Sequence, residues 1–223
     1  NIKHLDILFK TFLFLHILSG SIGLITGTIN IIRKKGDRRH KLTGKIFAYS
    51  MLITGVSALV LSVLHTNYFL FIVGVFTIYL VGTGYRYIYL KMSGSDLNPN
   101  FIDRALTFGM LIAGIAFIVY GIYILISGNN FGIVLMVFGI IGSGFVKTDI
   151  QNYKGKSIIK NYRLLAHLQR MTGGYIAAAT AFLVVNAKYS PVELPPILFW
   201  LLPTIILTPL IIKWSRKYSI NKT

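Results

Sequence analysis

Basic residues in this chain gather in alternate gaps between long uncharged apolar runs, and this alternation constrains the fold more than any other feature. Hydrophobic residues make up 54% of the chain, charged residues only 13%, and the mean hydropathy is +0.67. Soluble domains carry roughly 25% charged residues, so the composition excludes an ordinary soluble globular domain. The apolar runs instead suit a lipid bilayer, where a helix satisfies its own backbone hydrogen bonds.

The uncharged runs have the lengths of membrane-spanning helices, which need about 20 apolar residues. Residues 11–32 form one such run, whereas 46–85 and 105–146 are too long for one crossing and are broken by polar residues at 65–67 and 127–130. The sequence therefore predicts an all-α integral membrane protein. We expect one transmembrane domain, 1–223, that is a bundle of seven helices at about 7–32, 43–65, 68–90, 104–127, 131–147, 164–188 and 195–213.

The basic residues also predict an orientation, because short cytoplasmic loops retain Lys and Arg. Twenty of the 23 fall in alternate gaps and the C-terminal tail, which leaves Lys3, Lys10 and Lys188 for the other side. We therefore expect the N-terminus outside and the C-terminus in the cytoplasm, in a bacterial inner membrane. The net charge of +17 is then explained by topology and by attraction to anionic lipids, so no nucleic-acid partner is expected.

The first apolar run carries a polar and small stripe that consists of His16, Gly20, Gly23, Gly27 and Asn30. Their spacings of four, three, four and three place them on one helix face. Glycine permits the close approach of a neighbouring helix, so the stripe predicts a packed interface. An ionisable His16 within a membrane helix is costly and is expected to face the bundle interior.

A second group of polar residues is predicted at the cytoplasmic boundary. Arg163, His167, Arg170 and Gly174 share a helix face, and Asp149 is placed to pair with one of these arginines. Their common depth predicts that His40, Asp149, Arg163, His167 and Arg170 converge on one pocket. Arginine side chains favour anions, so the candidate anion-binding residues are Arg38, Arg39, Asp149, Arg163 and Arg170.

Three segments together resemble a known bacterial family. They are His16-x-x-x-Gly20, Arg33-x-x-Gly36-x-x-Arg39-His40-x-x-x-Gly44 and His167-x-x-Arg170-Met171. The pattern is similar to that of multi-pass membrane proteins grouped as domain of unknown function 2306, over most of the chain. The resemblance implies a fold and a membrane location, and it implies no reaction.

Several functions remain open at this stage, and the sequence does not decide whether the protein is an enzyme. One is a b-type haem protein, in which axial histidines would be the inner pair His40 and His167 or the outer pair His16 and His65. Another is a transporter or channel for a small anion or a proton. A third is a non-catalytic subunit of a membrane complex. An intramembrane enzyme is less favoured, because only six acidic residues are available for acid–base chemistry.

The expected partners follow from the same features. Membrane lipids surround the bundle, and the inner cluster suits an anionic small molecule or a lipid headgroup. A membrane-protein partner or a homo-oligomer is also compatible with the sequence. The chain has no cysteine, which excludes a disulfide framework and a thiolate metal site within it.

Overall fold

The architecture was taken from a computed structural model, which describes residues 2–220 except 94–95, 158 and 192–193. The expected seven α-helices are confirmed within these residues. They are α1 (Ile2–Ile32), α2 (Arg38–Leu64), α3 (Tyr68–Tyr87), α4 (Phe101–Ile126), α5 (Phe131–Tyr153), α6 (Tyr162–Asn186) and α7 (Pro196–Tyr218). A short 3-10 helix, η1 (Ala187–Tyr189), follows α6.

Six of the seven helices are long and apolar enough to cross a membrane, and α6 is the exception. The first half of α6 carries charged and polar side chains, including Arg163, His167 and Arg170. These side chains face other helices rather than lipid, as described below. The low hydropathy of α6 therefore reflects its central position in the bundle.

The observed helix bounds differ from the expected ones in two informative places. Helix α2 begins at Arg38 rather than near residue 43, because the Asp37 carboxylate accepts a hydrogen bond from the His40 backbone N–H (2.6 Å) and caps the helix. Gly36 precedes this cap with a φ of 87°, a conformation that favours glycine. Helix α5 continues past its expected end at residue 147 and ends at Tyr153. The polar C-terminal part of this helix is therefore longer than the sequence predicted.

A short hairpin lies between α3 and α4, where the sequence analysis expected no strand. Strands β1 (Lys91–Ser93) and β2 (Asp96–Asn98) pair in an antiparallel register with Lys91 opposite Asn98. Leu97 of this hairpin is buried and packs with Tyr87, Leu90, Tyr162 and Ala166. The hairpin therefore covers the ends of α3 and α6.

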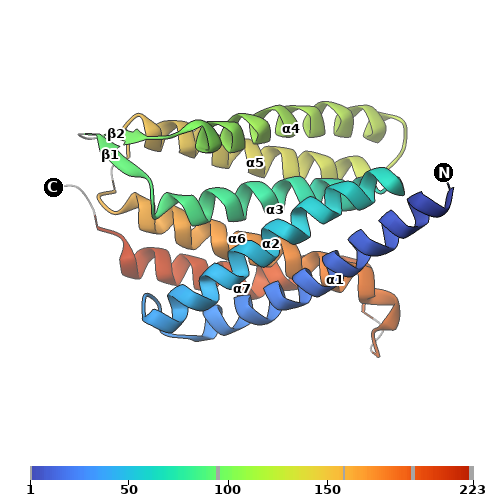
Figure 1. The fold of residues 1–223 in the computed structure, drawn as a ribbon. Coiled ribbons are helices and arrows are strands. Elements are labelled where there is room, and N and C mark those ends of the chain that lie inside the picture. The colour runs from blue at the N-terminus through green and yellow to red at the C-terminus, as the bar shows by residue number, and fades with distance from the viewer. Residues whose placement is uncertain (1, 94–95, 158, 192–193, 221–223) are drawn as a thin grey trace.

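The helices run alternately up and down the bundle, and the two ends of the chain lie at opposite ends of it (Figure 1). The α1–α2 loop, the hairpin, the α5–α6 loop and the C-terminal end of α7 share one end, which we call the basic end. The alternate gaps that hold the basic clusters in the sequence thus meet in space. Lys222 and the side chain of Lys3 lie outside the described residues.

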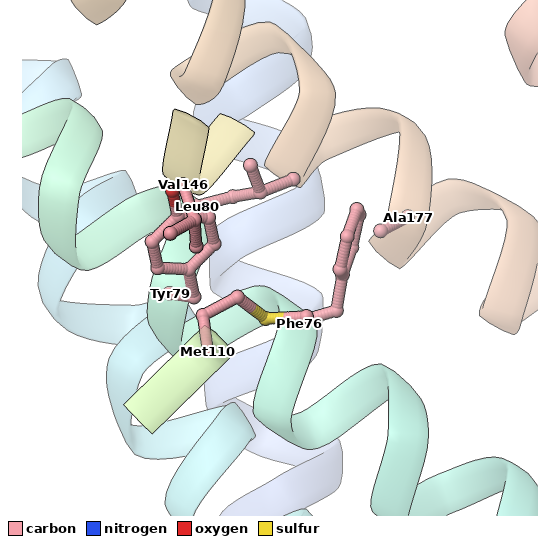
Figure 2. Packing of buried hydrophobic residues seen from close by; sticks show 6 residues of the cluster. All are labelled: Phe76, Tyr79, Leu80, Met110, Val146 and Ala177. Atoms are coloured by element: carbon pink, nitrogen blue, oxygen red, sulfur yellow. The ribbon is translucent and has the colours of Figure 1, made fainter. Parts of the chain in front are cut away.

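Helix α3 lies at the centre of the bundle and packs on α2, α4 and α6, while α1 pairs with α2, α4 with α5, and α6 with α7. Figure 2 shows the central cluster, in which Phe76, Tyr79 and Leu80 of α3 meet residues of three other helices, Met110, Val146 and Ala177. Large apolar side chains remain exposed on the outer helices, as lipid-facing surfaces require.

The glycine stripe of α1 is packed against neighbouring helices, as the sequence predicted. A Cβ atom added at Gly23 would lie 2.5 Å from Met51 Sδ of α2, and one at Gly27 would lie 2.4 Å from the Tyr175 ring of α6. These distances are shorter than any normal contact. The stripe therefore permits α1 to approach both helices closely.

Candidate functional site

The predicted polar face of α6 is directed at α3. The Arg163 guanidinium donates to the carbonyl oxygens of Tyr87 (3.2 Å) and Ile88 (2.6 Å) at the end of α3. The His167 ring is bonded through Nδ1 to the Gly84 carbonyl oxygen (2.8 Å). These contacts satisfy carbonyl groups that the end of a helix leaves without intrahelical partners.

Farther along this face, Arg170 forms a buried ion pair with Asp149 of α5, as the sequence anticipated for one of the arginines. Arg170 Nη2 lies 2.5 Å from Asp149 Oδ1, and Nη1 lies 3.1 Å from Oδ2. The two side chains are 1% and 0% exposed. The hydroxyls of Tyr79 and Tyr87 each donate to the same carboxylate (2.6 Å).

The remaining hydrogen-bonding groups of this pair are also occupied. Arg170 donates to Thr83 Oγ1 (2.8 Å) and to the Phe145 carbonyl oxygen (3.1 Å), and its guanidinium lies about 5 Å from three aromatic rings. A buried ion pair of this kind is stable only when its other hydrogen-bonding positions are filled. The Arg170–Asp149 pair is therefore a closed structural unit that joins α3, α5 and α6.

The sequence analysis missed the α3 side of this unit. Tyr79, Thr83 and Tyr87 recur at intervals of four along α3, so their hydroxyls lie on one helix face. That spacing was the available signal, because buried hydroxyl groups in a membrane helix need partners. Only the packing of α3 against α5 and α6 identifies the ion pair as that partner.

A cavity of about 310 Å³ opens among α1, α2, α3, α6 and α7, near the basic end, and we call it the basic-end cavity. Its basic lining residues are Lys35, Lys41, Lys45, His40 and His167. Its aromatic lining residues are Phe47, Tyr85, Tyr89, Tyr175, Trp214 and Tyr218. No acidic side chain is present among the residues that line it in the described part of the chain.

The two histidines of the cavity are held differently. His167 Nδ1 faces the Gly84 carbonyl oxygen, an acceptor, so the neutral ring carries its proton on Nδ1 and a lone pair on Nε2. His40 belongs to the first turn of α2, and its Nδ1 atom is buried without a hydrogen-bond partner among the described residues. A buried polar atom without a partner is costly. His40 Nδ1 therefore offers an unused hydrogen-bonding position in this wall of the cavity.

Lys35 lies on the α1–α2 loop and connects the end of α1 with α7. Its ammonium group donates to the carbonyl oxygens of Asn30 (2.6 Å) and Ile31 (2.8 Å) and lies 4.1 Å from the centre of the Trp214 ring. Burial lowers the pKa of Lys35. The hydrogen bond from the His40 backbone N–H lowers the pKa of the neighbouring Asp37 carboxyl. The loop thus carries a partly desolvated cation next to an ionised helix cap.

The predicted convergence of five residues on one pocket is only partly observed. His40 and His167 line the basic-end cavity, whereas Arg163 caps α3 and the Arg170–Asp149 pair is enclosed in the core. Arg163 and Arg170 are absent from the cavity because their guanidinium groups contact α3 and α5, and Asp149 belongs to α5, which does not line the cavity. Arg38 and Arg39 are exposed at the start of α2 and do not line the cavity.

The structure does not bring the outer histidines together. His16 contacts the Thr54 carbonyl oxygen (3.1 Å) and Ser57 Oγ (3.2 Å) in the middle of α2. His65 is exposed beyond the end of α2, about 16 Å along the helix from Thr54, and its ring packs edge-on against Phe9 (4.2 Å). The His16 contacts are those of a histidine that satisfies its polar group on a neighbouring helix.

The cavity has the chemistry of a site for a negative charge. Ammonium and imidazolium groups donate charge-assisted hydrogen bonds to phosphate or carboxylate oxygens. The described residues contain no group of three or more His, Asp or Glu side chains arranged to hold a metal ion. The sequence pointed to this basic segment for anion binding but favoured Arg38 and Arg39 over the lysines that line the cavity, and it did not indicate Trp214, since the association of these residues depends on helices far apart in the chain.

Residues 13–141 of the chain match the family described as "predicted membrane protein (DUF2306)". No curated protein and no solved structure matches the chain.

Proposed function

The chain belongs to the DUF2306 family of predicted membrane proteins, and from this premise we propose that it binds an anionic ligand in the basic-end cavity. The observation that carries the proposal is the charge of the lining: three lysines and two histidines, with no acidic residue among the described residues of the wall. Bringing like charges together at the edge of a bilayer is unfavourable unless an anion or water compensates them.

The contrast with three buried or partly buried arginines of the protein supports this proposal. Asp149 compensates Arg170, Asp103 compensates Arg86, and Asp37 lies 3.3 Å from Arg33. No such carboxylate faces the lysines within the described lining of the cavity. A bound phosphate or carboxylate would supply the missing negative charge, and His40 and His167 would add further donors when protonated.

We also propose that the basic end faces the cytoplasm, because short cytoplasmic loops retain Lys and Arg. Few of the described basic residues lie outside the basic end. Lys10 lies in the first half of α1, and Lys188 lies just after the C-terminal end of α6. Reporter fusions after Tyr218 test this orientation. A reporter that is active only outside the cytoplasm would overturn it.

The ligand proposal is tested by tryptophan fluorescence, because Trp214 lines the cavity and the chain contains only two tryptophans. In a W200F background, Trp214 is the single reporter. The purified protein in a non-ionic detergent is titrated with inorganic phosphate, decyl phosphate and, as an uncharged control, decanol. We expect a saturable change with at least one of the two phosphates and none with decanol.

Two matched triple variants show whether the fluorescence change reports binding in the cavity. K35Q/K41Q/K45Q removes three charges from the cavity and should weaken binding at least about tenfold, since a hydrogen bond to a charged group contributes about 1.5–3 kcal/mol. K34Q/R38Q/R39Q removes three charges from positions of the same segment that do not line the cavity and should leave binding nearly unchanged. Equal effects of the two variants, or no saturable response to either phosphate, would refute the proposal.

A second candidate is a b-type haem held by His40 and His167, and a specific observation favours it. Both histidines line the same cavity, and a backbone carbonyl orients His167 in the way that commonly prepares a histidine for metal ligation. The cavity volume of about 310 Å³ is at the lower end of the range for ligand pockets, so a rigid macrocycle fits it less well than an anionic group, either free or on a flexible chain that extends out of the cavity.

An absorption spectrum distinguishes the two candidates. Protein purified from cells supplied with a haem precursor should show a Soret band and a reducible α-band if haem is bound. Both bands should disappear in H40A and in H167A. A spectrum without haem bands, together with saturable phosphate binding, would leave the anion proposal as the function of the cavity.

A further inference from the structure

The basic-end cavity is much deeper than a small anion requires. Tyr175 lies about 20 Å along α6 from its first residue, Tyr162, and Phe47 lies about 14 Å along α2 from Arg38. Lys35 and Lys41 come from the loop and the first turn of α2, at the mouth of the cavity, and Lys45 lies one turn farther along α2, two residues before Phe47. The deep part is lined by aromatic and apolar groups, including Gly27, Phe47, Met171 and Tyr175.

This division into a charged mouth and an apolar interior matches the division within an amphiphile. A headgroup-sized anion needs only the mouth, whereas a hydrocarbon chain is stabilised by burial in the apolar interior. A water-soluble anion would leave the deep part of the cavity unused. The lining thus selects a ligand that carries both an anionic group and an apolar chain.

The side of the cavity between α1 and α7 is not closed by a helix–helix interface in the part of the chain that the structure describes. Helix α1 packs along α2, and α7 packs along α6, but the described residues form no comparable α1–α7 interface. The contact of Lys35 with the Trp214 ring crosses this side near the basic end. Both helices carry exposed apolar residues, among them Ile25 of α1 and Ile212 of α7.

Side-chain hydrogen bonds hold residues at both borders of this side. Helix α7 is attached to α6 through Gln169 and Ser215 (3.2 Å), and Asn161 is bonded to the backbone of both Tyr218 and Ile220. Lys35 belongs to a short loop whose turn depends on Gly36. The Lys35 ammonium also donates to the carbonyl oxygens of Asn30 and Ile31, so a lipid that enters here would have to displace the Lys35–Trp214 contact while α7 stays in place.

From these observations, and resting on the proposed anion-binding function, we infer that the ligand is an anionic membrane lipid that enters laterally between α1 and α7. Its phosphate would lie among Lys35, Lys41 and Lys45, and an acyl chain would extend toward Tyr175. Trp214 borders this path and would contact the chain of a bound lipid.

Brominated lipids test this inference, because bromine on an acyl chain quenches tryptophan at contact. The W200F protein is placed in lipid nanodiscs that contain increasing fractions of either brominated phosphatidylglycerol, which is anionic, or brominated phosphatidylcholine, which is zwitterionic. We expect half-maximal quenching of Trp214 at an at least about fivefold lower fraction of the anionic lipid, since each nearby Lys or Arg contributes about 1 kcal/mol of attraction.

The two triple variants separate a specific site from general attraction to the basic end. The preference for the anionic lipid should disappear in K35Q/K41Q/K45Q and persist in K34Q/R38Q/R39Q. K35R/K41R/K45R keeps the charges and should retain the preference, which controls for damage to the fold. Equal loss in both glutamine variants would assign the preference to the basic surface and overturn the inference.

The soluble-anion titration distinguishes failure of this inference from failure of the proposed function. Saturable binding of inorganic phosphate, combined with equal quenching by the two brominated lipids, would identify a water-soluble anion as the ligand. That outcome overturns lateral lipid entry and leaves anion binding intact. No response to inorganic phosphate, decyl phosphate or brominated phosphatidylglycerol would overturn both.

Discussion

The Arg170–Asp149 pair and the basic-end cavity place charged side chains near each other in opposite ways. In the first, one cation meets one carboxylate, and two tyrosine hydroxyls and a threonine complete the contacts. In the second, cations line a space without a carboxylate in the described wall. A buried charge with a carboxylate and all its hydrogen bonds stabilises the fold, whereas several cations around one cavity without a carboxylate make a surface suited to an anionic ligand.

The largest effect is expected from breaking the closed unit. D149N would leave the Arg170 guanidinium buried without its counter-charge, and loss of one partner from a buried ion pair costs about 3–5 kcal/mol. Thermal unfolding in detergent should therefore occur at a much lower temperature for D149N than for the parent protein. D6N is the matched control, because Asp6 is exposed and pairs only with Lys10 on the surface of α1.

Replacing both Arg170 and Asp149 tests whether the unpaired charge causes the loss of stability in D149N. R170M/D149L removes the charges together and should recover much of the stability lost in D149N, since an apolar pair leaves no charge unpaired. If D149N unfolds at the parent temperature, the closed unit does not stabilise the fold and the contrast with the cavity fails.

A smaller effect is expected when leucine replaces a glycine that is packed against a neighbouring helix, compared with a glycine that has open space around it. G23L would force atoms into the space of Met51, and overpacking typically costs about 1–3 kcal/mol. G109L is the matched control, because no atom lies within 4 Å of a Cβ added at Gly109. We expect a lower unfolding temperature for G23L alone, measured in detergent. Equal shifts for both variants would argue against close packing of α1.

The smallest effect concerns the pH dependence of the cavity. Burial lowers the pKa of Lys35, so in the empty cavity its ammonium loses the proton below the usual lysine range of about 10.4. Anion binding requires the protonated form and should weaken as pH rises through the lowered pKa. K35R stays charged throughout. Decyl phosphate affinity should therefore fall at alkaline pH in the parent and change less in K35R, and identical profiles would contradict this role for Lys35.

Much of the fold was predictable because membrane helices leave a direct mark on composition. Length and hydropathy located seven helices, and the spacing of Gly20, Gly23 and Gly27 identified the packed face of α1. The helix face of Arg163, His167 and Arg170 was also predicted, together with the pairing of Asp149 with one of the arginines. Each of these inferences depends on period and length along one helix.

The candidate site was predicted less completely. The sequence placed His40 and His167 near one another at the basic end, and both line the cavity. It also grouped them with Arg170 and Asp149, which lie at a similar depth but are enclosed with α3. Depth along a helix follows from the sequence, whereas the choice among several neighbouring helices depends on how the faces pack.

The sequence by itself determined that the chain forms a bundle of apolar helices whose basic gaps collect at one end, because helical period, span length and charge position are local properties. The tertiary structure alone decided which charges are enclosed and which line a cavity. Lys35 and Trp214 illustrate this, because they belong to segments far apart in the chain and meet only when α7 packs along α6 beside the end of α1. Long-range packing of this kind fixes the environment of a charge, and that environment separates a structural ion pair from a binding site.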